Sequence, residues 1–194
     1  MWPPALWKTV VGAGLAGLAA ALAAGRSGAR VILADEQSEF GGSLLGEADV
    51  AIDGKPATDW VAEVVAELES MPDVTLLRRA TVNGYYDHNY LTVAERVTDH
   101  LGVGLPTVPR QRLWKVRARR VVLATGAIER PLVFRDNDRP GVMLSSAVRG
   151  YAVRYGVLAG ERPLIVTGND DGYRTALALA DRHARVAGIV DLRN

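Results

Sequence analysis

The fold of this 194-residue chain is decided by one stretch near its start, Thr9-Val10-Val11-Gly12-Ala13-Gly14-Leu15-Ala16-Gly17. Apolar residues lead into a glycine turn, and an Ala/Leu-rich segment follows, which is typical of strand, turn and helix in that order. Gly12 permits a tight turn, Gly14 lets backbone approach a pyrophosphate, and Gly17 lets the helix pack close to the strand. The stretch therefore predicts a nucleotide site, with the pyrophosphate held at the helix N-terminus.

The next predicted strand, residues 30–34, ends in an acidic pair, Asp35 and Glu36. Asp35 lies about 20 residues beyond the glycines, where a carboxylate accepts a ribose hydroxyl in dinucleotide-binding folds. A negative pair at this point repels a 2'-phosphate, so we expect NAD or the ADP half of FAD and not NADP. The loop Gly41-Gly42-Ser43 follows, and we interpret it as passing close to the phosphates or ribose, with an ordinary turn as the alternative.

Two later segments complete the predicted site. A third strand over 74–77 continues through residues 80–82, and the backbone of Val82 is the expected adenine contact. The apolar run from Val121 ends in the small residues Ala124-Thr125-Gly126, which suit close approach to a cofactor at the carboxyl edge of a parallel sheet. Between these segments, alternating apolar and polar residues predict an antiparallel β-meander over about 84–119.

The expected fold is α/β, a doubly wound parallel sheet of the Rossmann type that binds FAD or NAD(P). We assign residues 1–135 to a first dinucleotide-binding domain that carries the meander. Residues 136–194 are expected to form a linker helix and the start of a second, truncated dinucleotide-binding domain. Its opening, Thr167-Gly168-Asn169-Asp170-Asp171-Gly172, has a degenerate glycine pattern, so we expect this second opening not to hold a nucleotide.

Composition limits the possible functions. A net charge of +1 with evenly mixed signs argues against a nucleic-acid or membrane surface. Residues 10–24 are apolar enough to resemble a signal-peptide core, but the three glycines and the following acid favour a folded strand and helix, and we expect a cytoplasmic protein. Cysteine is absent, which excludes disulfides, cysteine-ligated clusters and thiol redox chemistry in this chain.

No catalytic or metal site is predicted from the three histidines, His88, His100 and His183. They are widely separated and lack a neighbouring nucleophile or ligand spacing. His88 is interpreted as a hydrogen-bonded turn histidine in preference to a general base. Asn169 and Asp170 are likewise interpreted as a polar turn that caps a helix, with a nicotinamide contact as the alternative.

The order of several motifs resembles the central part of the α subunit of heterotetrameric sarcosine oxidase, over Thr9 to Asp191. The α subunits of opine and proline dehydrogenases and of hydrogen cyanide synthase are related to it. GAGLAG and ATGA are shared by all two-dinucleotide-domain flavoproteins, whereas GYYDHN, RQRLW and the altered TGNDDGY are more specific. The motifs that carry the resemblance are GAGLAG, ADEQ, FGG, GYYDHN, ERVTDH, RQRLWKVRA, VVLATGAIERPL, NDRPGVM and TGNDDGY.

The resemblance implies NAD in the first domain, with FAD and FMN elsewhere in a holoenzyme that has β, γ and δ subunits. That holoenzyme oxidises an N-methyl amino acid, sarcosine, to glycine and hydrogen peroxide, and the isolated chain is not expected to turn over. By matching motifs, NAD contacts fall on Ala16, Asp35, Glu36, Gln37, Ser43, Val82 and Ala124. The whole expected site is Gly12, Gly14, Ala16, Gly17, Asp35, Glu36, Gln37, Gly42, Ser43, Val82, Ala124, Thr125 and Gly126.

The chain departs from the family pattern in what it lacks. The amino-terminal ferredoxin-like region, the full second dinucleotide domain and the folate-binding carboxyl-terminal domain are all missing, which indicates a fragment or a truncated product. Two alternatives remain open. The first domain could hold FAD in a dye-linked opine or proline dehydrogenase subunit, or it could be a non-catalytic nucleotide-binding module.

Overall fold

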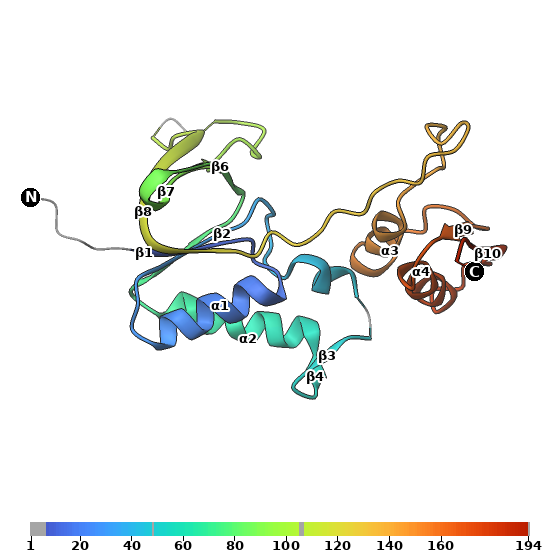
Figure 1. Cartoon of the computed structure of the whole chain (residues 1–194), viewed down its shortest axis with the longest axis horizontal. Helices are drawn as coiled ribbons and strands as arrows, with labels where there is room; N and C mark the ends of the chain where they lie inside the picture. The colour runs from blue at the N-terminus through green and yellow to red at the C-terminus, as the bar shows by residue number, and fades with distance from the viewer. Residues whose placement is uncertain (1–6, 48, 105–106, 194) are drawn as a thin grey trace, which may run out of the picture. The chain divides into compact units, whose positions relative to one another are not determined.

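A computed structural model describes residues 7–47, 49–104 and 107–193 of the chain. These residues form two compact units (Figure 1). Of the described residues, the first unit comprises 7–42, 52–104 and 107–126, and the second comprises 43–47, 49–51 and 127–193. Within the described residues, no helix is long and apolar enough to cross a membrane.

A parallel sheet forms the centre of the first unit. Its strand order is β5-β2-β1-β8, and every neighbouring pair runs parallel. The inner strand β2 is buried at all four positions, as expected for a parallel strand covered on both faces. This arrangement confirms the predicted α/β fold class. The strands are β1 (Trp7–Val11), β2 (Val31–Ala34), β5 (Val74–Leu77) and β8 (Gln111–Leu123).

Two helices, α1 (Leu15–Arg26) and α2 (Ala57–Ser70), cover one face of this sheet (Figure 1). Helix α2 buries Val61, Val64 and Leu68, the i, i+3, i+7 spacing that places apolar side chains on one face. Helix α1 buries Gly17, Leu18 and Ala21, whose i, i+1, i+4 spacing also places them on one face of the helix. Burying a leucine side chain such as that of Leu18 contributes roughly 1.5–3 kcal/mol.

A β-meander covers the opposite face of the parallel sheet (Figure 1). It consists of β6 (Ala80–Tyr86), the 3-10 turn η2 (Asp87–Asn89), β7 (Tyr90–Arg96) and the first half of β8. Its inward-facing side chains pack on those of the parallel strands. This shared apolar cluster contains Ile32, Ala34, Leu77, Ala80, Leu91, Val93, Val116 and Ala118.

The meander differs from the sequence prediction in two places. Strand β5 does not continue into residues 80–82, because Arg79 adopts a left-handed φ of 54° and the chain turns there into β6. Val82 therefore belongs to the meander. The end of the predicted meander, near residue 119, and the apolar run that begins at Val121 are not separate elements, because both belong to a single strand, β8, of 13 residues. Its first half pairs antiparallel with β7 and its second half parallel with β1.

The second unit contains the βαβ arrangement that the sequence predicts. Strands β9 (Leu164–Thr167) and β10 (Gly188–Asp191) pair parallel, and α4 (Asp171–Ala180) connects them. Helix α3 (Ser145–Arg154) packs against α4. The remaining short elements of the chain are η1 (Gly42–Gly46), β3 (Ala51–Ile52) and β4 (Lys55–Pro56).

A buried arginine organises the second unit. The Arg149 side chain is only 9% exposed and forms salt bridges with Glu47 at 3.0 Å and Asp171 at 2.9 Å. It also donates a hydrogen bond to the Thr175 hydroxyl at 2.9 Å. Because a buried charge left without partners is costly, this set fixes α3, the start of α4 and the residue 43–47 segment against one another.

Candidate nucleotide-binding site

Two of the three glycines in the first turn are required by packing. Gly12 has a φ of +94°, a conformation that disfavours other residues, and a Cβ there would collide with the carbonyl oxygen of Ala124. A Cβ on Gly17 would collide with the carbonyl oxygen of Gly12. These glycines bring α1 and the end of β8 into direct contact with the end of β1, as the fingerprint requires.

Gly14 is different, because its position faces open space. Apart from its chain neighbours, no atom of the described residues lies within 4 Å of the place a Cβ would take, and φ is an ordinary −75°. Gly14 is the N-cap of α1, no side chain caps this end, and the first turn carries no acid. The first N–H groups of a helix have no intrahelical acceptor. The space over Gly14 therefore fits a pyrophosphate, which those N–H groups and the helix dipole would hold.

Asp35 lies beside this turn, at the end of β2. One carboxylate oxygen accepts a hydrogen bond from the backbone N–H of Ala13 at 2.6 Å, and the other accepts one from that of Gln37 at 2.8 Å. Each oxygen keeps a further lone pair for a ribose hydroxyl. The sequence predicts the ribose contact, but it does not predict that Asp35 also braces the glycine turn. Glu36 and Gln37 are exposed next to it.

The double-glycine loop crosses directly over the glycine turn. The N–H of Gly41 donates to the carbonyl of Ala13 at 2.8 Å. Gly42 has a φ of +55°, and a Cβ there would come within 2.9 Å of the Cα of Gly14. Both glycines are therefore needed for this crossing, which supports the interpretation of the loop as part of the site. Ser43 follows, is exposed, and begins the segment that belongs to the second unit.

The other predicted contacts lie at strand ends of the first unit. The N–H of Ala124 donates to the carbonyl of Val11 at 2.8 Å, which holds the end of β8 next to β1. Thr125 and Gly126 follow and are exposed. The start of β6 is held by Ala80, whose N–H donates to the carbonyl of Asp35 at 2.8 Å. The Val82 side chain packs on the core, so only its backbone remains for the adenine contact that we expect.

The second glycine opening, at the start of α4, is filled by its own side chains. The N–H of Asp171 donates to the side-chain oxygen of Asn169 at 2.9 Å, and the N–H of Asn169 donates to the hydroxyl of Thr167 at 3.2 Å. Asp170 and Asp171 place two carboxylates at the helix N-terminus, where a pyrophosphate would be repelled. These contacts favour the predicted polar capping turn over a nicotinamide contact.

Ion pairs close this second opening further. Arg193 contacts Asp170 at 2.8 Å and Asp191 at 2.7 Å. Its hydrogen bonds hold the pKa of the Asp191 carboxyl well below its usual range. Asp191 also accepts a hydrogen bond from the Tyr173 hydroxyl at 3.0 Å, which raises the pKa of that phenol. Asp191 ends the second strand of this βαβ unit, which is the position of a ribose-binding acid in a dinucleotide-binding fold. Its carboxylate is already bonded to Arg193 and Tyr173.

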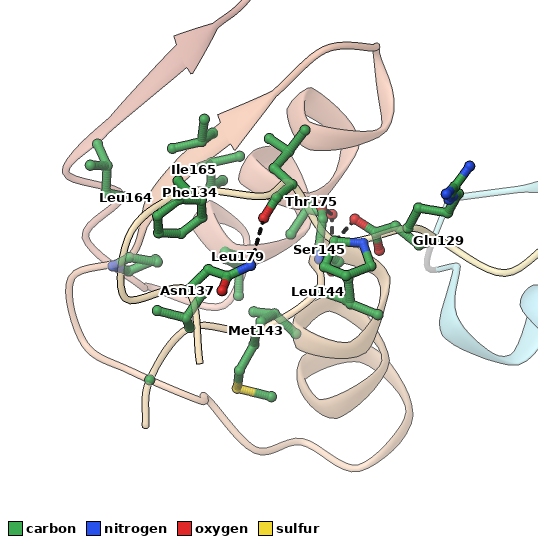
Figure 2. Close-up of a pocket in the computed structure, with 18 residues that line it drawn as sticks. Glu129, Phe134, Asn137, Met143, Leu144, Ser145, Leu164, Ile165, Thr175 and Leu179 are labelled. Atoms are coloured by element: carbon green, nitrogen blue, oxygen red, sulfur yellow. Dashed lines mark hydrogen bonds between the residues drawn. The ribbon is translucent and has the colours of Figure 1, made fainter. Parts of the chain in front are cut away.

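The second unit also contains an apolar cavity of about 420 Å³, lined by residues between Glu129 and Leu179 (Figure 2). Three of its polar lining residues take part in hydrogen bonds within the unit. The Glu129 carboxylate accepts hydrogen bonds from the backbone N–H groups of Ser145 and Ser146 at 3.1 and 2.7 Å, and the Ser145 hydroxyl donates to that of Thr175 at 2.7 Å. The cavity suits an apolar group and not a charged pyrophosphate.

No group of three histidines, aspartates or glutamates is placed to hold a metal ion among the residues that the structure describes. His88 lies in the exposed turn η2 with a φ of 58°. What the glycine turn of the first unit offers is a place for an anionic group at the N-terminus of α1.

The first unit matches a known protein family in sequence. The sequence model of the FAD dependent oxidoreductase family matches residues 9–126. The chain belongs to this family. The matched residues include β1, the glycine turn and α1, and the match ends at Gly126, the last residue of the expected site.

The chain is also similar to two oxidoreductase subunits in sequence and to one solved structure in fold. The chain is 52% identical to the alpha subunit of sarcosine oxidase from Rhizobium meliloti (strain 1021), over 95% of this chain and 18% of that protein. It is 33% identical to an opine oxidase subunit from Agrobacterium tumefaciens (strain Ach5), over 72% of this chain and 27% of that one. The chain thus spans about a fifth to a quarter of these relatives. The fold resembles L-proline dehydrogenase from P. horikoshii, with a TM-score of 0.77 and 24% identity over 97% of this chain and 36% of that one.

Proposed function

We propose that the first unit binds NAD and that the chain serves a sarcosine oxidase-like amine oxidoreductase. Gly12, Gly14, Ala16 and Gly17 form the pyrophosphate site in this proposal. Asp35, Glu36 and Gln37 surround the adenosine ribose. The further contacts are Gly42, Ser43, Val82, Ala124, Thr125 and Gly126.

One observation carries the proposal. The space over Gly14 is open and is bordered by an uncapped helix N-terminus and by the Asp35 carboxylate. An anionic group fits there because the helix N–H groups attract it. A ribose diol fits next to it, because Asp35 retains lone pairs. Glu36 adds a second negative charge that disfavours a 2'-phosphate.

At the level of the whole enzyme, we propose oxidative demethylation of sarcosine to glycine, in which the methyl carbon leaves at the oxidation level of formaldehyde and molecular oxygen takes up the two electrons as hydrogen peroxide. The catalytic FAD and an FMN belong to other parts of the assembly, which includes β, γ and δ subunits. The high identity to sarcosine oxidase α subunits supports this assignment. In this proposal the isolated chain binds nucleotide and does not turn over, because the catalytic flavin belongs to another part of the assembly.

A second candidate is that the same site holds FAD, in a subunit of an opine or proline dehydrogenase. The match to the FAD dependent oxidoreductase family favours it, since the fingerprint binds only the ADP half that NAD and FAD share. In that case Asp35 and the glycine turn would keep the roles given to them above.

The test is to denature the purified chain and to identify the released nucleotide by absorbance and mass. Release of NAD is the expected result, and release of FAD would replace the first candidate by the second. If the chain is isolated empty, added NAD is expected to raise its melting temperature, because a ligand that binds only the folded state stabilises it. An NADP response equal to that of NAD would contradict the role given to Glu36.

A further inference from the structure

The outer face of the β-meander carries a row of cations without acidic partners. Along β8, Lys115, Arg117 and Arg119 alternate with Val116 and Ala118. The two apolar residues are buried, and the three cations are exposed on the other face. Among the described residues, no carboxylate lies within salt-bridge distance of any of these three cations.

Six of the ten other lysines and arginines of the first unit form salt bridges with carboxylates, whereas Lys115, Arg117 and Arg119 form none in the described part of the chain. Residues two apart on one strand face are separated by about 7 Å, which is less than the Debye length at physiological salt. The three cations therefore repel one another. The six salt bridges are Arg26–Glu67, Arg30–Asp73, Lys55–Glu63, Arg78–Glu69, Arg110–Asp99 and Arg112–Glu95.

Aromatic and apolar side chains lie on the same face as the cations. The strand register places Tyr90 opposite Arg117, and the Arg117 guanidinium lies 5.6 Å from the centre of the Tyr90 ring. On the next strand, Tyr86 pairs with Tyr90, and their ring centres are 6.0 Å apart. Leu113, two residues before Lys115, is 56% exposed.

Gly84 leaves room for the Tyr86 ring on this face. A Cβ on Gly84 would come within 2.6 Å of the Thr92 hydroxyl and of the Tyr86 hydroxyl, so the Tyr86 ring lies across the glycine. Tyr86 is nevertheless 57% exposed. Tyrosine and arginine are among the residue types that most often carry binding energy at protein interfaces.

We propose that this face, made of Tyr86, Tyr90, Leu113, Lys115, Arg117 and Arg119, docks an acidic surface of another protein. Partner carboxylates would pair with the three cations and relieve their repulsion. Leu113 and the two tyrosines would supply the apolar contact area. A protein partner is favoured over nucleic acid because the whole chain has a net charge of only +1, although this face is basic. The proposal does not depend on which nucleotide the first unit binds.

The first experiment measures binding of a fluorescein-labelled 20-residue peptide of glutamate with interspersed leucine and tyrosine, by anisotropy at low salt. The triple variant K115E/R117E/R119E is expected to bind about tenfold more weakly or worse, because it removes three ion pairs. The variant R174E/R185E changes two exposed arginines in the second unit and is expected to bind as the unaltered chain does. L113S keeps every charge and is expected to weaken binding severalfold.

Two results would overturn the proposal. Equal loss of binding in the triple variant and in R174E/R185E would show a general charge effect. Tighter binding of a 20-base-pair DNA duplex, or of vesicles containing phosphatidylserine, than of the peptide would assign the face to another class of partner. Circular dichroism of each variant, compared with the unaltered chain, establishes that a loss of binding is not a loss of fold.

A second measurement uses the chain inside the cell that makes it. A photo-crosslinking residue at Leu113 is expected to link a partner through a peptide rich in aspartate and glutamate, and the triple charge reversal is expected to abolish that link. The same crosslinker at the exposed Ala62 of α2 serves as the control. Links at position 113 that are unchanged by the charge reversal would contradict an acidic docking partner.

Discussion

Replacing Gly14 by alanine separates nucleotide binding from folding. The added methyl group meets no atom of the described residues and φ is compatible with alanine, so the free energy of unfolding is expected to change by less than about 1 kcal/mol. This small value reflects two opposing effects, the lower entropy of the unfolded chain and the loss of a favourable glycine N-cap. The melting temperature of the empty chain should therefore move by no more than about 4 °C.

The same methyl group occupies the space assigned to the pyrophosphate. It prevents the close approach that the helix N–H groups need, and hydrogen bonds to a charged group are worth about 1.5–3 kcal/mol each. Loss of one to two such bonds weakens NAD binding by roughly 10-fold to more than 100-fold. Isothermal titration calorimetry with NAD measures this change directly.

The matched control is G150A, because Gly150 in α3, apart from its chain neighbours and its own helix backbone, also has no atom of the described residues within 4 Å of its Cβ position. As a helix-interior substitution it is expected to stabilise the chain by up to about 1 kcal/mol and to leave NAD affinity unchanged. If G14A bound NAD as tightly as the unaltered chain, the pyrophosphate would not lie over this turn. If G14A unfolded the chain, the methyl group would have no room at this position, and the open space described over Gly14 would be contradicted.

Four further outcomes are expected. G17A forces a methyl group against a backbone carbonyl, an overpacking that costs about 2 kcal/mol and lowers the melting temperature by about 4–8 °C; an unchanged value would contradict the contact. D35N keeps an acceptor for the buried N–H of the turn but removes the charge, so NAD binding is expected to weaken about tenfold or more while the fold persists by circular dichroism. T9V replaces the Thr9 hydroxyl, which is buried and has no hydrogen-bond partner among the described residues, and is expected to stabilise the chain by about 1 kcal/mol in urea unfolding. R193M removes the partner that lowers the pKa of Asp191. The stability that this lowered pKa contributes is present above about pH 4, the usual aspartate pKa, and is lost as pH falls through the lowered pKa. The melting temperatures of R193M and the unaltered chain should therefore differ at about pH 7 and converge toward about pH 2.

The sequence predicts the strand, glycine turn and helix of the first unit well because the signals for them are local. The glycines at 12, 14 and 17 and the acid at 35 each depend on backbone geometry within one βαβ unit, and the structure places them together. The second role of Asp35, as acceptor for the N–H of Ala13, involves residues 22 positions apart, and a propensity argument carries no signal for such a contact.

The meander is harder to predict for a related reason. Alternation of side chains identifies strands in the 80–120 region, but a strand that changes partners part-way has no special sequence pattern. Residues 113–119 alternate and 121–123 are uniformly apolar, so the pattern predicts two elements where the structure has one. The turn at Arg79 has no sequence signal either, because arginine is an uncommon residue at a left-handed φ.

The long strand β8 has a consequence for how the molecule tolerates change. Its first half is fixed in register on β7 by seven residue pairs, from Tyr90 with Arg117 to Arg96 with Gln111. Its other end places Ala124 next to the glycine turn. Side chains on a strand alternate between faces, so a one-residue slip inverts every one of them. An insertion in the loop before Gln111 would leave both registrations intact, whereas a single inserted residue between Ala118 and Leu123 would put them out of phase. Natural length variation is therefore expected in that loop and not in the strand, because the strand holds the glycine turn although it lies far from those glycines along the chain.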